Sequence, residues 1–185
     1  MNIKKSSKSL VEPKVKDELY ALMEELYPIC RSITGNGVRK TLKILKKKIP
    51  LKIIEVPTGT KVFDWKIPLE WNIKDAYVKN LEGKRIIDFK KSNINLLNYS
   101  VPINKKITQK ELKLHLHTLP DKPDSIPYVT SYYKKNWGFS VAHNQLESFN
   151  DDYYDVKIDS SLKPGSLTYG EFLKKGKISD EILIS

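Results

Sequence analysis

The sequence is poor in cysteine and in long apolar runs, and each shortage excludes a class of protein. Cys30 is the single cysteine among 185 residues, so no internal disulfide can form and nothing requires an oxidising compartment. No apolar run approaches the roughly 20 residues of a membrane-spanning helix. The charged N-terminus is not followed by the apolar stretch of a signal peptide. We therefore expect a cytoplasmic protein without a membrane span.

Arginine is also scarce, although the chain is basic. There are 33 lysine and arginine residues against 22 acidic ones, a net charge of +11, but only Arg31, Arg39 and Arg85 are arginines. Proteins that read phosphates and bases specifically favour arginine for its planar guanidinium group. The densest basic run, residues 46–48, is most simply the solvated face of a helix. We expect no nucleic-acid partner and only weak, salt-sensitive attraction to DNA.

The composition that remains is that of a globular protein, with 39% hydrophobic and 30% charged residues. Apolar residues at helical spacing predict a helix from about residue 15 that Pro28 kinks or ends. A second helix is predicted between Gly37 and Pro50, packed beside the first, and residues 51–56 predict a strand. This first part of the chain therefore indicates an α/β arrangement.

From Trp65 onward the pattern changes to short strands separated by polar breaks. The predicted strands are residues 73–78, 85–89, 96–101, 153–158, 166–174 and 180–185, with a short capped helix from Thr108 through His115. The change predicts a disordered tail at 1–14, an α/β part at 15–64, a small β-rich α+β domain at 65–160 and returning strands at 161–185. The small β-rich domain looks like a separate unit.

Most sequence signatures of catalysis are absent, including the P-loop, HExxH, CxxC and GxSxG patterns. His115 and His117 could face one side of an extended segment and bind a metal ion, or could bond backbone carbonyls at a helix end. The lack of a third ligand nearby in the sequence favours the second interpretation. We therefore assign no catalytic residue and no metal ligand.

An aromatic segment, residues 128–139, is denser in rings than a loop requires, and it could cover a small core or form a binding surface. Our candidates for substrate binding are Tyr132, Tyr133, Trp137 and His143. The two adjacent tyrosines should face opposite ways in an extended stretch. His143 is either a hydrogen-bonding residue at a strand end or a substrate contact.

Four segments carry a resemblance to a known family: LYPICRSITG at 26–35, FDWKIPLEWNIKDAYV at 63–78, HTLPDKPDSIPYVTSYYKKNWGF at 117–139 and LTYGEFLKKG at 167–176. Together they resemble a bacterial family of aminopeptidase-like proteins, often described as polysaccharide-biosynthesis proteins with an aminopeptidase-like domain. The resemblance runs in order over residues 15–185.

The resemblance implies a zinc-exopeptidase-like α/β fold with a small inserted domain, in the N-terminal part of a longer hydrolase. In such families the strand matching residues 181–185 is followed by a metal-binding histidine and later by acidic ligands. Zinc is therefore expected in the intact family member, whereas this chain alone should bind none and be inactive. The implied substrate is a peptide or an amide-containing small molecule. The alternative is a non-catalytic binding or assembly module.

Overall fold

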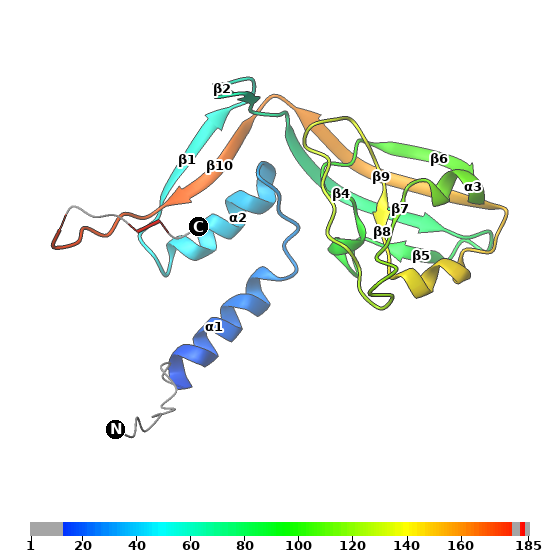
Figure 1. The fold of residues 1–185 in the computed structure, drawn as a ribbon, viewed down its shortest axis with the longest axis horizontal. Helices are drawn as coiled ribbons and strands as arrows, with labels where there is room; N and C mark the ends of the chain where they lie inside the picture. The colour runs from blue at the N-terminus through cyan, green and yellow to red at the C-terminus, as the bar shows by residue number, and fades with distance from the viewer. Residues whose placement is uncertain (1–12, 179–181, 184–185) are drawn as a thin grey trace, which may run out of the picture.

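The computed structural model describes residues 13–178 and 182–183, and its elements form two units (Figure 1). The flanking unit contains α1 (Pro13–Leu26), α2 (Gly35–Lys46), β1 (Lys52–Pro57), β2 (Lys61–Val62), β3 (Trp65–Lys66) and β10 (Ser166–Glu171). The sheet unit contains β4 (Glu70–Lys79), β5 (Arg85–Asp88), the 3-10 helix η1 (Asn93–Asn95), β6 (Ile103–Thr108), α3 (Gln109–Lys113), β7 (Leu116–His117), β8 (Phe139–Ser140), the 3-10 helix η2 (His143–Ser148) and β9 (Tyr153–Lys163). No helix within the described ranges is long and apolar enough to cross a membrane.

In the flanking unit, β1 and β10 form a two-stranded antiparallel sheet in which Ile53 lies opposite Gly170. Helix α2 packs on one face of this sheet. A Cβ at Gly170 would lie 2.9 Å from a methyl carbon of Leu42, so the helix packs closely on the sheet at this position. The predicted second helix and the strand after it are confirmed, and the helix ends at Lys46, before Pro50.

Helix α1 differs from the prediction in its packing. It forms where the apolar spacing predicted it and begins at Pro13, a favourable first position because proline needs no N–H partner there. Its apolar stripe is not packed beside α2, however, since Leu19 and Met23 are 53% and 64% exposed. Residues 1–12 of the predicted tail lie outside the described part of the chain.

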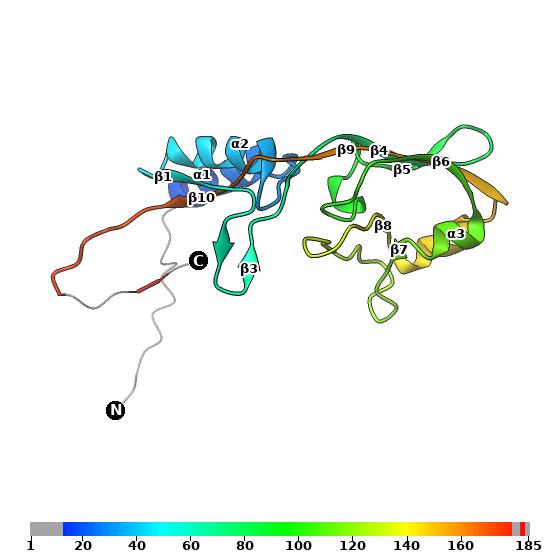
Figure 2. The same cartoon turned by 90° about the horizontal axis from the view of Figure 1, so that it is seen from above.

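The sheet unit is built on a four-stranded antiparallel sheet with the order β5-β4-β9-β6. Helix α3, β7 and β8 lie on one side of this sheet, as Figure 2 shows. Between the sheet and these elements lies a core of buried side chains, among them Val78, Leu112, Phe139, Tyr154 and Ile158. Strands predicted by alternating apolar residues at 73–78, 85–89 and 153–158 are all present in this sheet.

The strand predicted at 96–101 is wrong. These residues follow η1 as an irregular segment that makes isolated bridges from Leu96 to Phe139 and from Asn98 to Thr130. Tyr99 adopts a φ of +68°, a left-handed conformation that no regular strand accommodates. Because the segment is buried on all sides, its apolar run looked like a strand in the sequence although the backbone turns within it.

Two boundaries near the predicted capped helix and the C-terminus also need correction. The hydroxyl of Thr108 accepts a hydrogen bond from the Glu111 N–H at 3.2 Å, as the capping pattern predicted. The helix ends at Lys113, and His115 lies beyond it. The predicted strand at 180–185 falls mostly outside the described residues, and Ile182 and Leu183 belong to no regular element.

Candidate functional site

The loop that precedes α2 is the meeting point of segments far apart in the sequence. The Ile33 carbonyl accepts a hydrogen bond from the Thr168 N–H at 3.1 Å, which ties the loop to β10. The hydroxyl of Thr34 accepts from the Trp71 N–H at 3.0 Å, which ties it to β4. Three of the four segments that carry the family resemblance therefore meet around Thr34.

The aromatic segment, residues 128–139, joins the same place through Asn98 and Tyr99. The side-chain amide of Asn98 donates to the Arg31 carbonyl at 3.2 Å, and its backbone N–H donates to the Val129 carbonyl at 2.9 Å. The hydroxyls of Tyr99 and Thr34 are 2.7 Å apart, and burial raises the pKa of Tyr99 to about 12. The fourth segment is thereby held against the other three.

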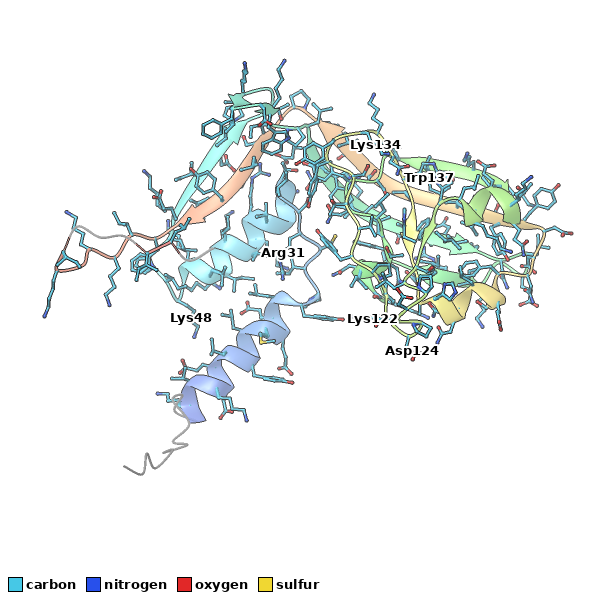
Figure 3. The ribbon with its side chains drawn as sticks, viewed as in Figure 1. Arg31, Lys48, Lys122, Asp124, Lys134 and Trp137 are labelled. Atoms are coloured by element: carbon cyan, nitrogen blue, oxygen red, sulfur yellow. The ribbon has the colours of Figure 1, made fainter. Side chains whose placement is uncertain are left out.

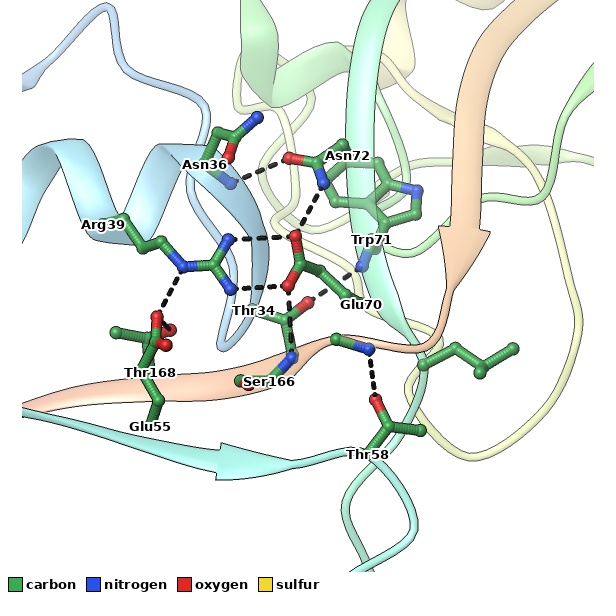
Figure 4. A network of polar contacts seen from close by, with 12 residues as sticks. Thr34, Asn36, Arg39, Glu55, Thr58, Glu70, Trp71, Asn72, Ser166 and Thr168 are labelled. Atoms are coloured by element: carbon green, nitrogen blue, oxygen red, sulfur yellow. Dashed lines mark hydrogen bonds and ion pairs between the residues drawn. The ribbon is translucent and has the colours of Figure 1, made fainter.

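A network of ion pairs and hydrogen bonds links the flanking unit to the start of β4 in the sheet unit (Figure 4). The guanidinium of Arg39 in α2 makes two hydrogen bonds to the carboxylate of Glu70 in β4, at 2.9 and 2.5 Å, and a third to Glu55 in β1 at 2.7 Å. The N–H of Ser166 also donates to Glu70, at 3.1 Å. These hydrogen bonds, led by those from Arg39, hold the pKa of Glu70 at about 2. We call Arg39, Glu55, Glu70 and Ser166 the junction network.

A cavity of about 340 Å³ opens beside the junction network. Its lining residues are Cys30, Ser32, Thr34, Asn36, Gly37, Trp71, Asn72, Ile73, Lys74 and Phe89. Asn72 contributes to its shape, because its side-chain oxygen accepts from the Asn36 N–H at 2.8 Å and holds the start of α2 against β4. The cavity combines apolar walls with amide and hydroxyl groups, as binding sites for small molecules do.

The four candidate residues for substrate binding lie in different environments. Tyr132 is half-buried and packs edge-on against Tyr99, with ring centroids 5.0 Å apart. Tyr133 is 83% exposed, so the two tyrosines do face different surroundings. Trp137, labelled in Figure 3, is buried and stacks on His115. His143 begins η2 and its Nδ1 lies 3.0 Å from the hydroxyl of Thr118.

Of the two histidines at 115 and 117, His115 has a backbone partner for its ring. The Nδ1 of His115 lies 3.0 Å from the Trp137 carbonyl, as the hydrogen-bonding interpretation predicted. Burial, with a smaller contribution from His115, lowers the pKa of His117. Within residues 13–178 and 182–183, no three histidine, cysteine or acidic side chains lie close enough together to hold a metal ion. The described residues thus do not fit a zinc site.

Cys30 is the remaining candidate nucleophile, and its surroundings oppose that role. Burial raises the pKa of its thiol to about 11, and neighbouring Arg31 offsets this only in part. The thiol therefore stays protonated near neutral pH, where a reactive cysteine would be ionised. The arrangement around Thr34 can position segments and bind a small ligand, and the Cys30 thiol is not an activated nucleophile.

Sequence reasoning missed the junction network. Arg39 and Glu70 are 31 positions apart, and Arg39 and Glu55 are 16 apart, so no local spacing links them. Arg39 did stand out as one of three arginines in a lysine-rich chain, and that was the available signal. The planar guanidinium of arginine bonds one carboxylate through two N–H groups and keeps a third N–H for another carboxylate, a fixed geometry that the lysine ammonium lacks.

The chain is similar in sequence to a bacterial protein with an aminopeptidase-like domain. The chain is 60% identical over 168 residues to a Clostridium acetobutylicum protein named "Putative polysaccharide biosynthesis protein with aminopeptidase-like domain". The match covers 91% of this chain. The resemblance to the aminopeptidase-like family is confirmed. Residues 70–161 also match a family described as "Domain of unknown function (DUF2172)", and these bounds closely follow the sheet from β4 to β9.

A solved structure supports the same relationship. It is described as "Crystal structure of putative peptidase" from Clostridium acetobutylicum, and it matches this chain with a TM-score of 0.82 and 60% identity over 86% of the chain. The mixed helix-and-strand fold predicted from the sequence is therefore shared with this solved structure. This chain spans 39% of the length of the curated relative and 38% of the chain in the crystal structure.

Proposed function

We propose that this chain is the N-terminal, substrate-positioning part of a longer zinc-dependent aminopeptidase-like hydrolase linked to surface polysaccharide biosynthesis. The zinc ligands and the catalytic carboxylate would come from the portion of the relatives that this chain does not cover. Alone, the chain would be inactive. Its substrate in the intact protein would be a peptide or an amide-containing small molecule.

The observation that carries this proposal is the convergence of all four family-like segments around Thr34, together with 60% identity to the aminopeptidase-like relative. Segments that meet at one place and form the wall of a cavity are suited to positioning a ligand. The described residues offer no metal-binding group of their own, so the chemistry would have to be supplied by the remaining polypeptide.

The proposal is tested by comparing this chain with a chimera in which the unmatched part of the Clostridium acetobutylicum relative follows Ser185. We expect the chimera to hydrolyse aminoacyl amide substrates, to lose that activity with a chelator and to regain it with zinc. This chain alone should not hydrolyse these substrates, with or without added zinc. A folded chimera that binds zinc but cleaves no aminoacyl substrate would instead favour the alternative, a non-catalytic binding or assembly module.

The sheet unit would be a domain inserted into the α/β part. In support, β1 and β10 pair although the whole sheet unit lies between them in the sequence. The buried core cluster also lies entirely between Trp71 and Ile158. We predict that residues 65–160, expressed alone, unfold in one cooperative thermal transition. A gradual, non-cooperative melt of this fragment would argue against an inserted domain.

The two adjacent tyrosines should respond differently to substitution. Tyr132→Ala removes the ring packed on Tyr99 and should lower the free energy of unfolding by about 2 kcal/mol. Tyr133→Ala removes an exposed ring and should leave the melting temperature unchanged, while lowering kcat/KM of the active chimera. Urea titrations and steady-state kinetics measure these effects. Equal destabilisation by both, with activity per folded molecule unchanged, would assign both rings to the core.

A further inference from the structure

The hairpin formed by β2 and β3 presents a large aromatic side chain in an unfavourable backbone conformation. Its two-residue turn is Phe63-Asp64, since Val62 pairs directly with Trp65. Phe63 has a φ of +54° and is 92% exposed. A bulky residue at positive φ is an outlier that persists where surrounding structure or function holds it. Within this chain Phe63 has almost no packing that could hold it there.

The two-stranded sheet next to the hairpin has an apolar face that α2 does not cover, on which Ile54, Val56 and Leu167 are half-buried. Alternation places Ile53 and Glu55 toward α2, so Ile54 and Val56 point the other way. Their partners in β10 are Tyr169 and Leu167, and Tyr169 is 45% exposed. In Figure 2 the hairpin projects from this sheet on the side opposite to α2. We call Ile54, Val56, Phe63, Leu167 and Tyr169 the docking face.

Exposed apolar side chains are distributed unevenly between the two units. The core cluster lies within the sheet unit, which exposes only Leu81, Leu114, Leu119, Tyr128, Tyr133 and Tyr153 among its described large apolar side chains. The flanking unit and the described residues that follow β10 expose many: Val15, Leu19, Tyr20, Met23, Tyr27, Ile49, Val62, Phe63, Leu69, Tyr169, Phe172, Leu173, Ile178, Ile182 and Leu183. A two-stranded sheet depends on packing against other elements for its stability, and the apolar side chains left exposed in this unit offer surface for more of it.

We infer that the docking face is covered by the part of the longer aminopeptidase-like polypeptide that this chain does not include, with Phe63 inserted into an apolar pocket on it. This inference rests on the proposed function for the existence of that part. It is favoured over other occupants because this chain spans only 39% of its curated relative, which leaves more than enough polypeptide to cover the face. Docking would supply the packing that holds Phe63 at positive φ.

Thiol labelling tests the inference without relying on catalysis. In a Cys30→Ser background, Asp64→Cys places a reporter at the hairpin turn and keeps Phe63, and peptide-resolved mass spectrometry follows its labelling by a maleimide. We expect position 64 to react at least about tenfold more slowly in the chimera than in this chain alone. Lys84→Cys, in the exposed turn between β4 and β5, should react equally in both.

A substitution of Phe63 then tests how much its aromatic ring contributes to the docking. Phe63→Asn is compatible with positive φ, so it should leave the melting temperature of this chain unchanged but lower that of the chimera by several degrees. Leu114→Asn, an exposed apolar residue of the sheet unit, should change neither. Should the chimera fail to fold, hydrogen exchange at the matching hairpin of the Clostridium acetobutylicum protein, intact and cut back to the matched region, replaces the labelling comparison.

Equal labelling of position 64 in this chain and in the chimera would overturn the inference. So would protection that appears in this chain alone and rises with protein concentration, since a second copy would then cover the face. Protection that appears only with anionic phospholipid vesicles would assign the face to a membrane surface and overturn it equally. If position 64 is protected in a chimera that has no hydrolase activity, the docking inference stands and only the proposed hydrolase function is rejected.

Discussion

Gly35→Ala should be among the most destabilising single substitutions in this protein, with an expected loss of about 3–5 kcal/mol in the free energy of unfolding. Gly35 has a φ of +87°, and a Cβ there would lie 2.2 Å from the Trp71 carbonyl oxygen. That oxygen belongs to the backbone of β4 and cannot move aside as a flexible side chain can. The change would therefore push α2 away from β4 and break the hydrogen bonds around Thr34.

Gly59→Ala is the matched control for this prediction. Gly59 has nearly the same φ, +86°, but a Cβ there would meet nothing within 4 Å. It should cost only about 1 kcal/mol, the penalty for a side chain in the left-handed region. Urea denaturation of the two variants separates the backbone penalty from the steric clash. Equal losses in the free energy of unfolding would show that the backbone around Gly35 shifts to relieve the clash at little cost.

Glu70→Gln should destabilise the protein by about 2 kcal/mol near neutral pH, because it removes a partly buried charge from the two hydrogen bonds of Arg39. The effect should depend on pH. The pKa of Glu70 is held at about 2 in the folded state, below its ordinary value of 4.5. A carboxyl group with a depressed folded pKa stabilises the fold above the ordinary value, and this contribution is lost as the pH falls from about 4.5 toward 2.

The measurement is the free energy of unfolding of wild type and variant at about pH 7 and about pH 3. The difference between them should shrink at the lower pH. Glu55→Gln is the control, since Glu55 bonds the same guanidinium but its side chain is 49% exposed, and such pairs contribute about 0–1 kcal/mol. A Glu70→Gln variant with a loss that stays constant over this pH range would assign the effect to packing rather than to charge.

Features that depend on neighbours along the chain could be predicted from the amino-acid sequence. Helix α2 and the cap at Thr108 follow from residues three or four positions apart, and β4 and β9 follow from alternation, so each could be predicted locally. The resemblance to the aminopeptidase-like family could also be recognised in the sequence, because two of its four segments, 63–78 and 117–139, are long enough to be specific.

Features that depend on residues distant in the sequence became visible only in the folded structure. The irregular path of residues 96–101 follows from burial on every side and from the left-handed Tyr99, which no periodicity reveals. The stripe on α1 predicted a packed helix, but an apolar pattern indicates which face can be buried and not whether a partner is present in the chain. The bonds from Arg39 to Glu55 and Glu70 exist because folding brings α2, β1 and β4 together, at sequence separations where the chain imposes no geometry.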